Sequence, residues 1–140
     1  MPDDGPATAA QQRRTTVTHA VGAEYEVGLR AFFGYRDLGV KDVTGGGYTA
    51  HIIRAIPGQH SNAQWHTHDL DFQFVLVLKG WVKFCYEDIG EVTLQAGDSV
   101  YQPPLVKHVE VAHSDDMELV EITSPAEFPT HVVDAPAGRG

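Results

Sequence analysis

Two histidines spaced two residues apart are the part of this sequence best suited to chemistry. His66 and His68 lie in the segment Trp65-His66-Thr67-His68. On a β-strand, side chains two residues apart face the same side, so both imidazoles can reach one point. Imidazole is the commonest protein ligand of divalent transition metals. The spacing therefore predicts a pair of metal ligands on one strand.

Further ligands must come from other parts of the chain. His108 follows a Gly97-Asp98 turn and Pro103-Pro104 on a different predicted strand, which makes it the best third candidate. Gln73 lies five positions after His68 and is the candidate for a fourth ligand. An isolated pair of histidines is more often solvated, but these candidates lie beside turns and a buried strand, which favours a metal site.

The elements that would position these side chains are short strands. Apolar runs separated by Gly, Pro and Asp predict strands within residues 24–36, 48–56, 64–68, 72–78, 81–86, 91–94, 99–102, 108–112 and 118–123. Strands at spacings near ten residues are typical of an all-β sandwich or barrel. We expect a flexible N-terminal arm over residues 1–18, a single domain over 19–123 and a C-terminal tail over 124–140.

Composition excludes several classes of function. The chain has 140 residues, 42% of them hydrophobic, and its 10 Lys and Arg against 19 Asp and Glu give a net charge of −9. This balance argues against nucleic-acid and anionic-membrane partners, which need clustered cations. The run over residues 74–78 is far too short for a membrane helix, and residues 1–20 lack the apolar core of a signal peptide. We expect a cytoplasmic protein with a small-molecule substrate.

The same residues resemble the two motifs of the cupin superfamily. The first motif, G-x5-H-x-H-x4-E-x6-G, is matched at His66, His68, Gln73 and Gly80. The second, G-x5-P-x-G-x2-H-x3-N, is matched at Gly97, Pro103 and His108. The resemblance covers residues 50–123. It implies a double-stranded β-helix, a jelly-roll-like cupin barrel, with one metal bound by the three histidines, and it implies a homodimer.

Four positions depart from the motifs, and one of them affects chemistry. His60, Leu105 and Ala112 replace two glycines and an asparagine at loop or packing positions. Gln73 replaces the usual glutamate. Three neutral imidazoles and a neutral amide leave a divalent ion its full charge, so we expect the site to favour an anionic ligand.

The resemblance implies a metal-dependent enzyme with dioxygenase-like, oxidoreductase chemistry on a small anionic organic substrate. Iron is the expected metal, with Zn, Ni, Mn and Co as alternatives. Three other interpretations stay open: a non-catalytic sensor or storage protein that binds a metal or small molecule, a metal-dependent isomerase, and a metal-free epimerase that uses a His–Tyr pair.

Few residues are candidates for a catalytic acid or base. Tyr86 and His51 are the two that the sequence suggests, both on predicted strands. Tyr86 shares a strand face with Val82 and Phe84, and we expect some of these three to line a cavity. The remaining histidines, which include His113, lie near predicted turns or tails, where we expect them to be solvated.

Overall fold

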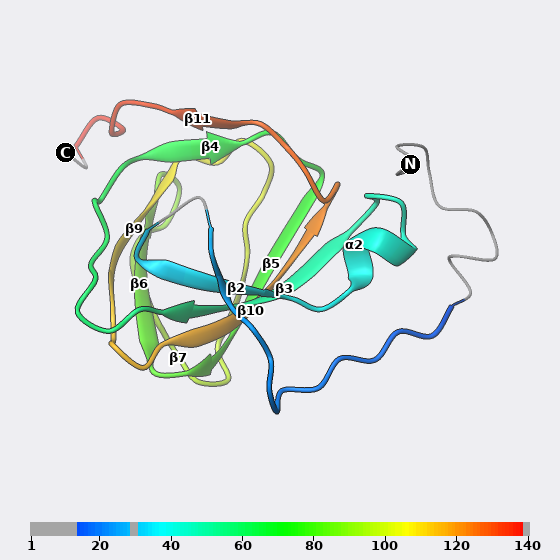
Figure 1. Cartoon of the computed structure of the whole chain (residues 1–140). Helices are drawn as coiled ribbons and strands as arrows, with labels where there is room; N and C mark the ends of the chain where they lie inside the picture. The colour runs from blue at the N-terminus through cyan, green and yellow to red at the C-terminus, as the bar shows by residue number, and fades with distance from the viewer. Residues whose placement is uncertain (1–13, 29–30, 139–140) are drawn as a thin grey trace.

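The computed structural model describes residues 14–28 and 31–138, and its regular structure is almost all β-strand. One sheet has the strand order β1 (Glu26–Val27), β2 (Phe33–Asp37), β3 (Thr49–Ala55), β10 (Glu118–Ser124), β5 (Phe72–Lys79), β8 (Ser99–Tyr101). The other has the order β11 (Thr130–Val132), β4 (His66–His68), β9 (His108–His113), β6 (Trp81–Tyr86), β7 (Gly90–Gln95). Figure 1 shows the two sheets curving around a shared interior, which confirms the expected cupin barrel.

The strands form where apolar residues alternate with the period of a pleated sheet. In β5, Gln73, Val75 and Val77 are buried, whereas Phe72 and Leu78 on the other face are exposed. This period of two directs one face of each strand into the barrel. The interior is filled by apolar side chains from both sheets, among them Phe33, Ile53, Val75, Val77, Val82, Phe84, Leu94, Met117 and Leu119.

Glycines make the sharp connections between strands. Gly80 alone separates β5 from β6, which belong to different sheets, and its φ is +67°. Gly90 closes the hairpin between β6 and β7 with a φ of +79°. Residues with a Cβ rarely adopt this left-handed conformation, so glycine suits both positions.

The two ends of the described chain differ in how much of them forms regular structure. Residues 1–13 of the expected N-terminal arm lie outside the described residues. Within the expected tail, β11 pairs with β4, so residues 130–132 form part of the second sheet (Figure 1). The only helix in the described ranges is the short α2 (Val40–Val43). No helix within residues 14–28 and 31–138 has the length and apolar character to span a membrane.

Candidate metal centre

Three histidines meet inside the barrel because two strands of the second sheet are paired. His66 in β4 is the cross-strand partner of His108 in β9, and their ring centroids lie 4.2 Å apart. His68, two residues along β4, lies 4.8 Å from His66 and 5.0 Å from His108 between ring centroids. One nitrogen from each ring lies within 4.8 Å of the other two. The structure thus brings together the three predicted histidines.

The second ring nitrogen of each histidine is held by a hydrogen bond. The Nδ1 atoms of His66 and His108 lie 2.8 Å and 2.9 Å from the carbonyl oxygens of Gln64 and Val106. A carbonyl only accepts, so Nδ1 carries the proton and the lone pair is on Nε2 in both rings. Metal-binding imidazoles are oriented in this way by their outer hydrogen bonds.

This donor set fits one transition-metal ion. Three cis nitrogens on one ion with bonds near 2.1 Å lie about 3.0–3.5 Å apart, a spacing within reach of small rotations of these side chains. Neutral imidazoles suit iron, zinc, nickel and copper, whereas magnesium and calcium prefer oxygen. His66 and His108 are buried, and His68 is half-buried, so the three rings can exclude water from one side of an ion.

The C-terminal segment completes the surroundings of His68. Its Nδ1 lies 2.8 Å from the hydroxyl oxygen of Thr130 in β11. The ring of Phe128 packs edge-on against the imidazole, with centroids 5.2 Å apart. Sequence reasoning missed both residues, because they lie about 60 positions from His68 and belong to no motif.

Gln73 lies in the wall of the same interior, but it is engaged with a carboxylate. Its Nε2 donates to Oε2 of Glu121, 3.0 Å away. His51 Nε2 lies 2.7 Å from the other oxygen, Oε1. Since a carboxylate accepts, this pair of contacts orients the Gln73 amide with its nitrogen toward Glu121. Glu121 is thus a charged neighbour of Gln73 that the sequence analysis did not identify.

The environment of Glu121 favours its charged form. Burial raises the pKa of this carboxyl, but the hydrogen bond and charge of His51, together with the Gln73 amide, bring the net pKa below its ordinary value. The four expected ligands are neutral, but a carboxylate lies directly behind Gln73 and is already paired with His51.

These side chains open onto a cavity of about 250 Å³. Its wall is mainly apolar, with Phe33, Ile53, Val75, Val82, Phe84, Leu119 and Phe128. The polar residues of the wall include the three histidines, Gln73, Gln102, Glu110, Glu121 and His51. An apolar cavity with a few convergent polar groups is typical of a small-molecule site.

The two candidate acid–base residues lie in different places. His51 lines the cavity, next to Glu121. Tyr86 packs against His108, with centroids 5.8 Å apart, and is not among the cavity-lining residues of the described chain. Burial, with smaller contributions from Asp88 and Glu121, raises the pKa of the Tyr86 phenol far above its usual range. Val82 and Phe84, from the same strand face, do line the cavity.

One expectation about the remaining histidines is wrong. His113 is buried, with 7% of its surface exposed, rather than solvated. It ends β9, and a β-bulge in the pairing of β9 with β6 turns it inward: Lys83 pairs with Ala112, but the next residue, Phe84, pairs with Glu110. A bulge shifts the alternation of a strand by one residue, which sequence alternation alone does not reveal.

Comparison with known proteins agrees with the motifs. The family model of the cupin domain matches residues 52–123. A comparison with curated protein sequences found no match.

Solved structures with the same fold include a polyketide cyclase. The polyketide cyclase RemF from Streptomyces resistomycificus is 15% identical, with 89% of each chain covered and a TM-score of 0.71. KdgF from Halomonas sp. is 16% identical, with 80% of this chain and 96% of KdgF covered and a TM-score of 0.65. HppE in its FeII form is 16% identical, with 87% of this chain and 65% of HppE covered and a TM-score of 0.64. At these identities the similarity establishes the fold alone.

Proposed function

Because this chain belongs to the cupin family, we propose that it is a metal-dependent enzyme acting on a small anionic organic substrate. His66, His68 and His108 would hold one divalent transition metal, iron first, with zinc, nickel, manganese and cobalt as alternatives. The reaction class proposed is a dioxygenase-like oxidation.

One observation carries this proposal. Three imidazoles converge at the wall of a mainly apolar cavity, and for two of them a backbone carbonyl determines which ring nitrogen bears the lone pair. Buried histidines that serve only packing have no reason to direct their nitrogens to a common point. Ligands prepared in this way lose little entropy when they bind an ion.

In this proposal, different residues bind the metal, exclude water and contact the ligand. A divalent ion held by these three neutral imidazoles would supply a Lewis-acid centre for an anionic ligand and, if it is iron, for dioxygen. Val82, Phe84 and Leu119 form an apolar part of the cavity wall. This part of the wall would keep water away from a bound substrate. Gln73 orients its amide through Glu121, so its carbonyl oxygen is the atom that can turn to the ion or to a ligand.

A metal-dependent isomerase is the second candidate, and the His51–Glu121 pair favours it. Both residues line the cavity and share a 2.7 Å hydrogen bond. An imidazole backed by a carboxylate can accept and return a proton, which an isomerisation requires and an oxidation by dioxygen does not.

Metal content is the decisive first measurement. The protein is produced without chelator or affinity-resin metal, and its metals are measured by mass spectrometry for wild type, His108→Ala and the exposed control His60→Ala. We expect close to one transition-metal ion per chain in wild type and His60→Ala, and a loss of at least tenfold in His108→Ala. Equal trace metal in all three proteins would refute the metal site.

Activity then separates the candidate functions. We expect the iron-loaded protein to consume dioxygen in the presence of a diketone such as acetylacetone, and His108→Ala not to do so. Hydrogen exchange into a substrate without dioxygen uptake would favour the isomerase instead. Metal binding with neither activity across a panel of small anions would indicate a non-catalytic binding protein.

A further inference from the structure

Glu110 is a buried carboxylate in the cavity wall that neither the motifs nor the metal site explains. It lies two residues after His108 in β9, lines the cavity, and has only 5% of its surface exposed. Buried carboxylates are rare unless both oxygens are paired, because removing a charge from water is costly.

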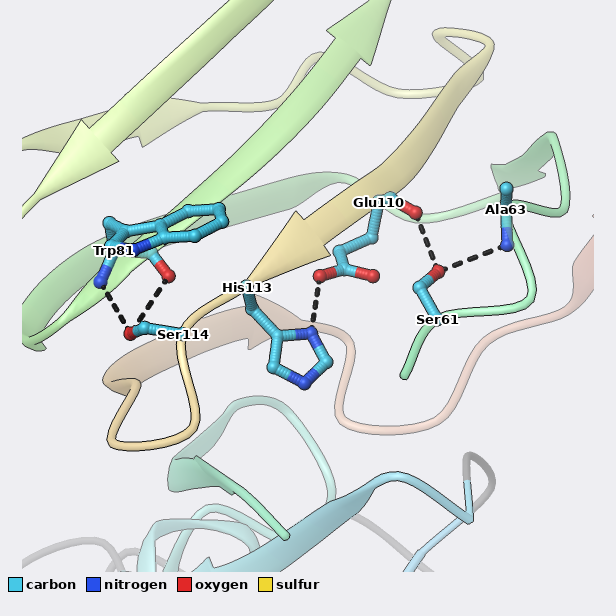
Figure 2. A network of polar contacts seen from close by, with 6 residues as sticks. All are labelled: Ser61, Ala63, Trp81, Glu110, His113 and Ser114. Carbon is cyan, nitrogen blue, oxygen red and sulfur yellow. Dashed lines mark hydrogen bonds and ion pairs between the residues drawn. The ribbon is translucent and has the colours of Figure 1, made fainter. Parts of the chain in front are cut away.

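Protein groups satisfy only one of the two Glu110 oxygens. His113 Nδ1 lies 2.7 Å from Oε1, and Figure 2 draws this contact as a dashed line. Oε2 is buried and has no hydrogen-bond partner within residues 14–28 and 31–138. Glu121, the other carboxylate of the wall, differs, since His51 and Gln73 occupy both of its oxygens. Of the two carboxylates in the wall, only Glu110 therefore has an oxygen that could accept a hydrogen bond from a ligand without losing one from the protein.

The fold holds Glu110 through its other oxygen atoms, Oε1 and the backbone carbonyl. The bulge between β9 and β6 brings Glu110 and His113, three residues apart, to the same side of the strand. The His113 ring packs against Phe32 and Phe33, with centroids 6.0 Å and 5.1 Å away, so it cannot swing freely. The hydroxyl of Ser61 donates to the backbone carbonyl of Glu110 over 2.6 Å and anchors the same residue from the other side (Figure 2).

We propose that Oε2 of Glu110 is a specificity-determining acceptor, which takes a hydrogen bond from a hydroxyl group of the molecule bound in the cavity. A single unpaired oxygen matches the single donor of a hydroxyl. An ammonium group would bring three donors into a mainly apolar wall and leave the others unpaired. The inference concerns the cavity and holds whether or not a metal is bound.

Discrimination at such a site is strong for a physical reason. A site built to pair with a hydroxyl rejects an analogue without it, because the buried protein atom is then left unpaired. Leaving a buried acceptor without its hydrogen bond changes affinity by roughly tenfold. The ligand that fits is therefore a small hydroxyl-bearing molecule, with its apolar part against the side chains of the wall.

Pairs of alcohols and methyl ethers test this directly. Binding of benzyl alcohol, cyclohexanol and 1-butanol, each with its methyl ether, is measured by ligand-observed NMR on the full-length protein. We expect wild type to bind at least one alcohol about tenfold more tightly than its ether. Failure of every alcohol to bind, or equal affinity within every pair, would overturn the proposal.

A variant of Glu110 with nearly the same shape tests whether its Oε2 causes the preference for an alcohol over its methyl ether. In Glu110→Gln the amide oxygen can still accept from His113, and the amide nitrogen then takes the place of Oε2 as a donor. We expect this variant to lose or reverse the preference for alcohol, and the exposed control Glu91→Gln, which has the same change of charge, to retain it. An unchanged preference in Glu110→Gln refutes the assignment.

A second measurement does not depend on the stability of the variant. In a crystal of wild type soaked with the preferred alcohol, we expect the hydroxyl oxygen about 2.5–2.8 Å from Oε2 of Glu110. An alcohol bound in the cavity with its hydroxyl elsewhere overturns the proposal. Metal content is measured on the same samples, so a failure of the metal site remains distinguishable from a failure of this inference.

Discussion

At the scale of single residues, the site depends on which atoms already have partners. Gln73 is engaged by Glu121, and Glu121 by His51, so a change at one position affects a chain of three side chains. A glutamine at the position where the family motif has glutamate is explained by this contact, since a second carboxylate at 73 would face the first.

Gln73→Glu tests that explanation. It replaces a donor 3.0 Å from Glu121 Oε2 with a second carboxylate, so we expect the free energy of unfolding of the metal-free protein at neutral pH to fall by about 1–3 kcal/mol. In the double variant with Glu121→Gln, an amide at position 121 can donate to a carboxylate at position 73. This variant should therefore recover part of the lost free energy of unfolding. Urea denaturation of both proteins measures this; additive losses in the double variant would contradict it.

At the scale of elements, strands from distant parts of the chain hold the histidines. The pairing of β4 with β9 sets His66 against His108, and the pairing of β4 with β11 brings Thr130 to His68. The last strand therefore contributes to the site, although it contains none of the predicted ligands.

Thr130→Val removes the hydrogen-bond partner of His68 Nδ1 and keeps the shape of the side chain. Outer partners of metal-binding histidines contribute roughly 10- to 100-fold to metal affinity. We expect a loss of about that size for cobalt(II), measured by competition with a chromogenic chelator. Thr130→Ser retains the hydroxyl and should bind nearly as well as wild type; a similar loss in both variants would show that packing, not the hydrogen bond, matters.

Substitution of Gly80 tests why glycine is needed where the chain passes from β5 in one sheet to β6 in the other. A Cβ there would collide with the Ser114 hydroxyl, which is bonded to the Trp81 amide, and would lie 3.0 Å from Met117 Cα. Gly58 has a similar φ of +81° but open space around it. We expect Gly58→Ala to lower the free energy of unfolding by about 1 kcal/mol and Gly80→Ala by about 2 kcal/mol or more. Equal losses in thermal denaturation would contradict the steric argument.

At the scale of the whole molecule, the outer face of the first sheet is unusually apolar. Phe72, Leu78 and Tyr101 are 39%, 47% and 52% exposed, and Phe74, Leu76, Val120 and Ile122 on the same face are half-buried. Phe72 and Tyr101 contact each other, with ring centroids 5.8 Å apart. Contiguous exposed apolar surface of this kind marks association sites, and a single face of a chain can pair with itself about a two-fold axis.

We therefore expect a homodimer through this face. Light scattering after size exclusion should give twice the chain mass of 15.3 kDa. Phe72→Glu, which places a charge in the face, should yield a monomer. Ile89→Glu, at an exposed apolar residue of the β6–β7 turn, should remain a dimer. A monomeric wild type at micromolar concentration would contradict the expectation.

The sequence alone determined most of the strands and the first pair of histidines, because both follow from local alternation. His66 and His68 share a face wherever their strand is placed, and Gln73, Val75 and Val77 share the inner face of β5 for the same reason. The family motifs added His108 and the barrel.

Only the tertiary structure decided which groups surround those histidines. Glu121, Thr130 and Glu110 reach the cavity through cross-strand pairing, and the inward position of His113 depends on a bulge. Pairing and register depend on where each strand lies in the sheet, which is a property of the whole chain. The alternation within one strand contains no information about its neighbours, so these contacts had no signal in the sequence.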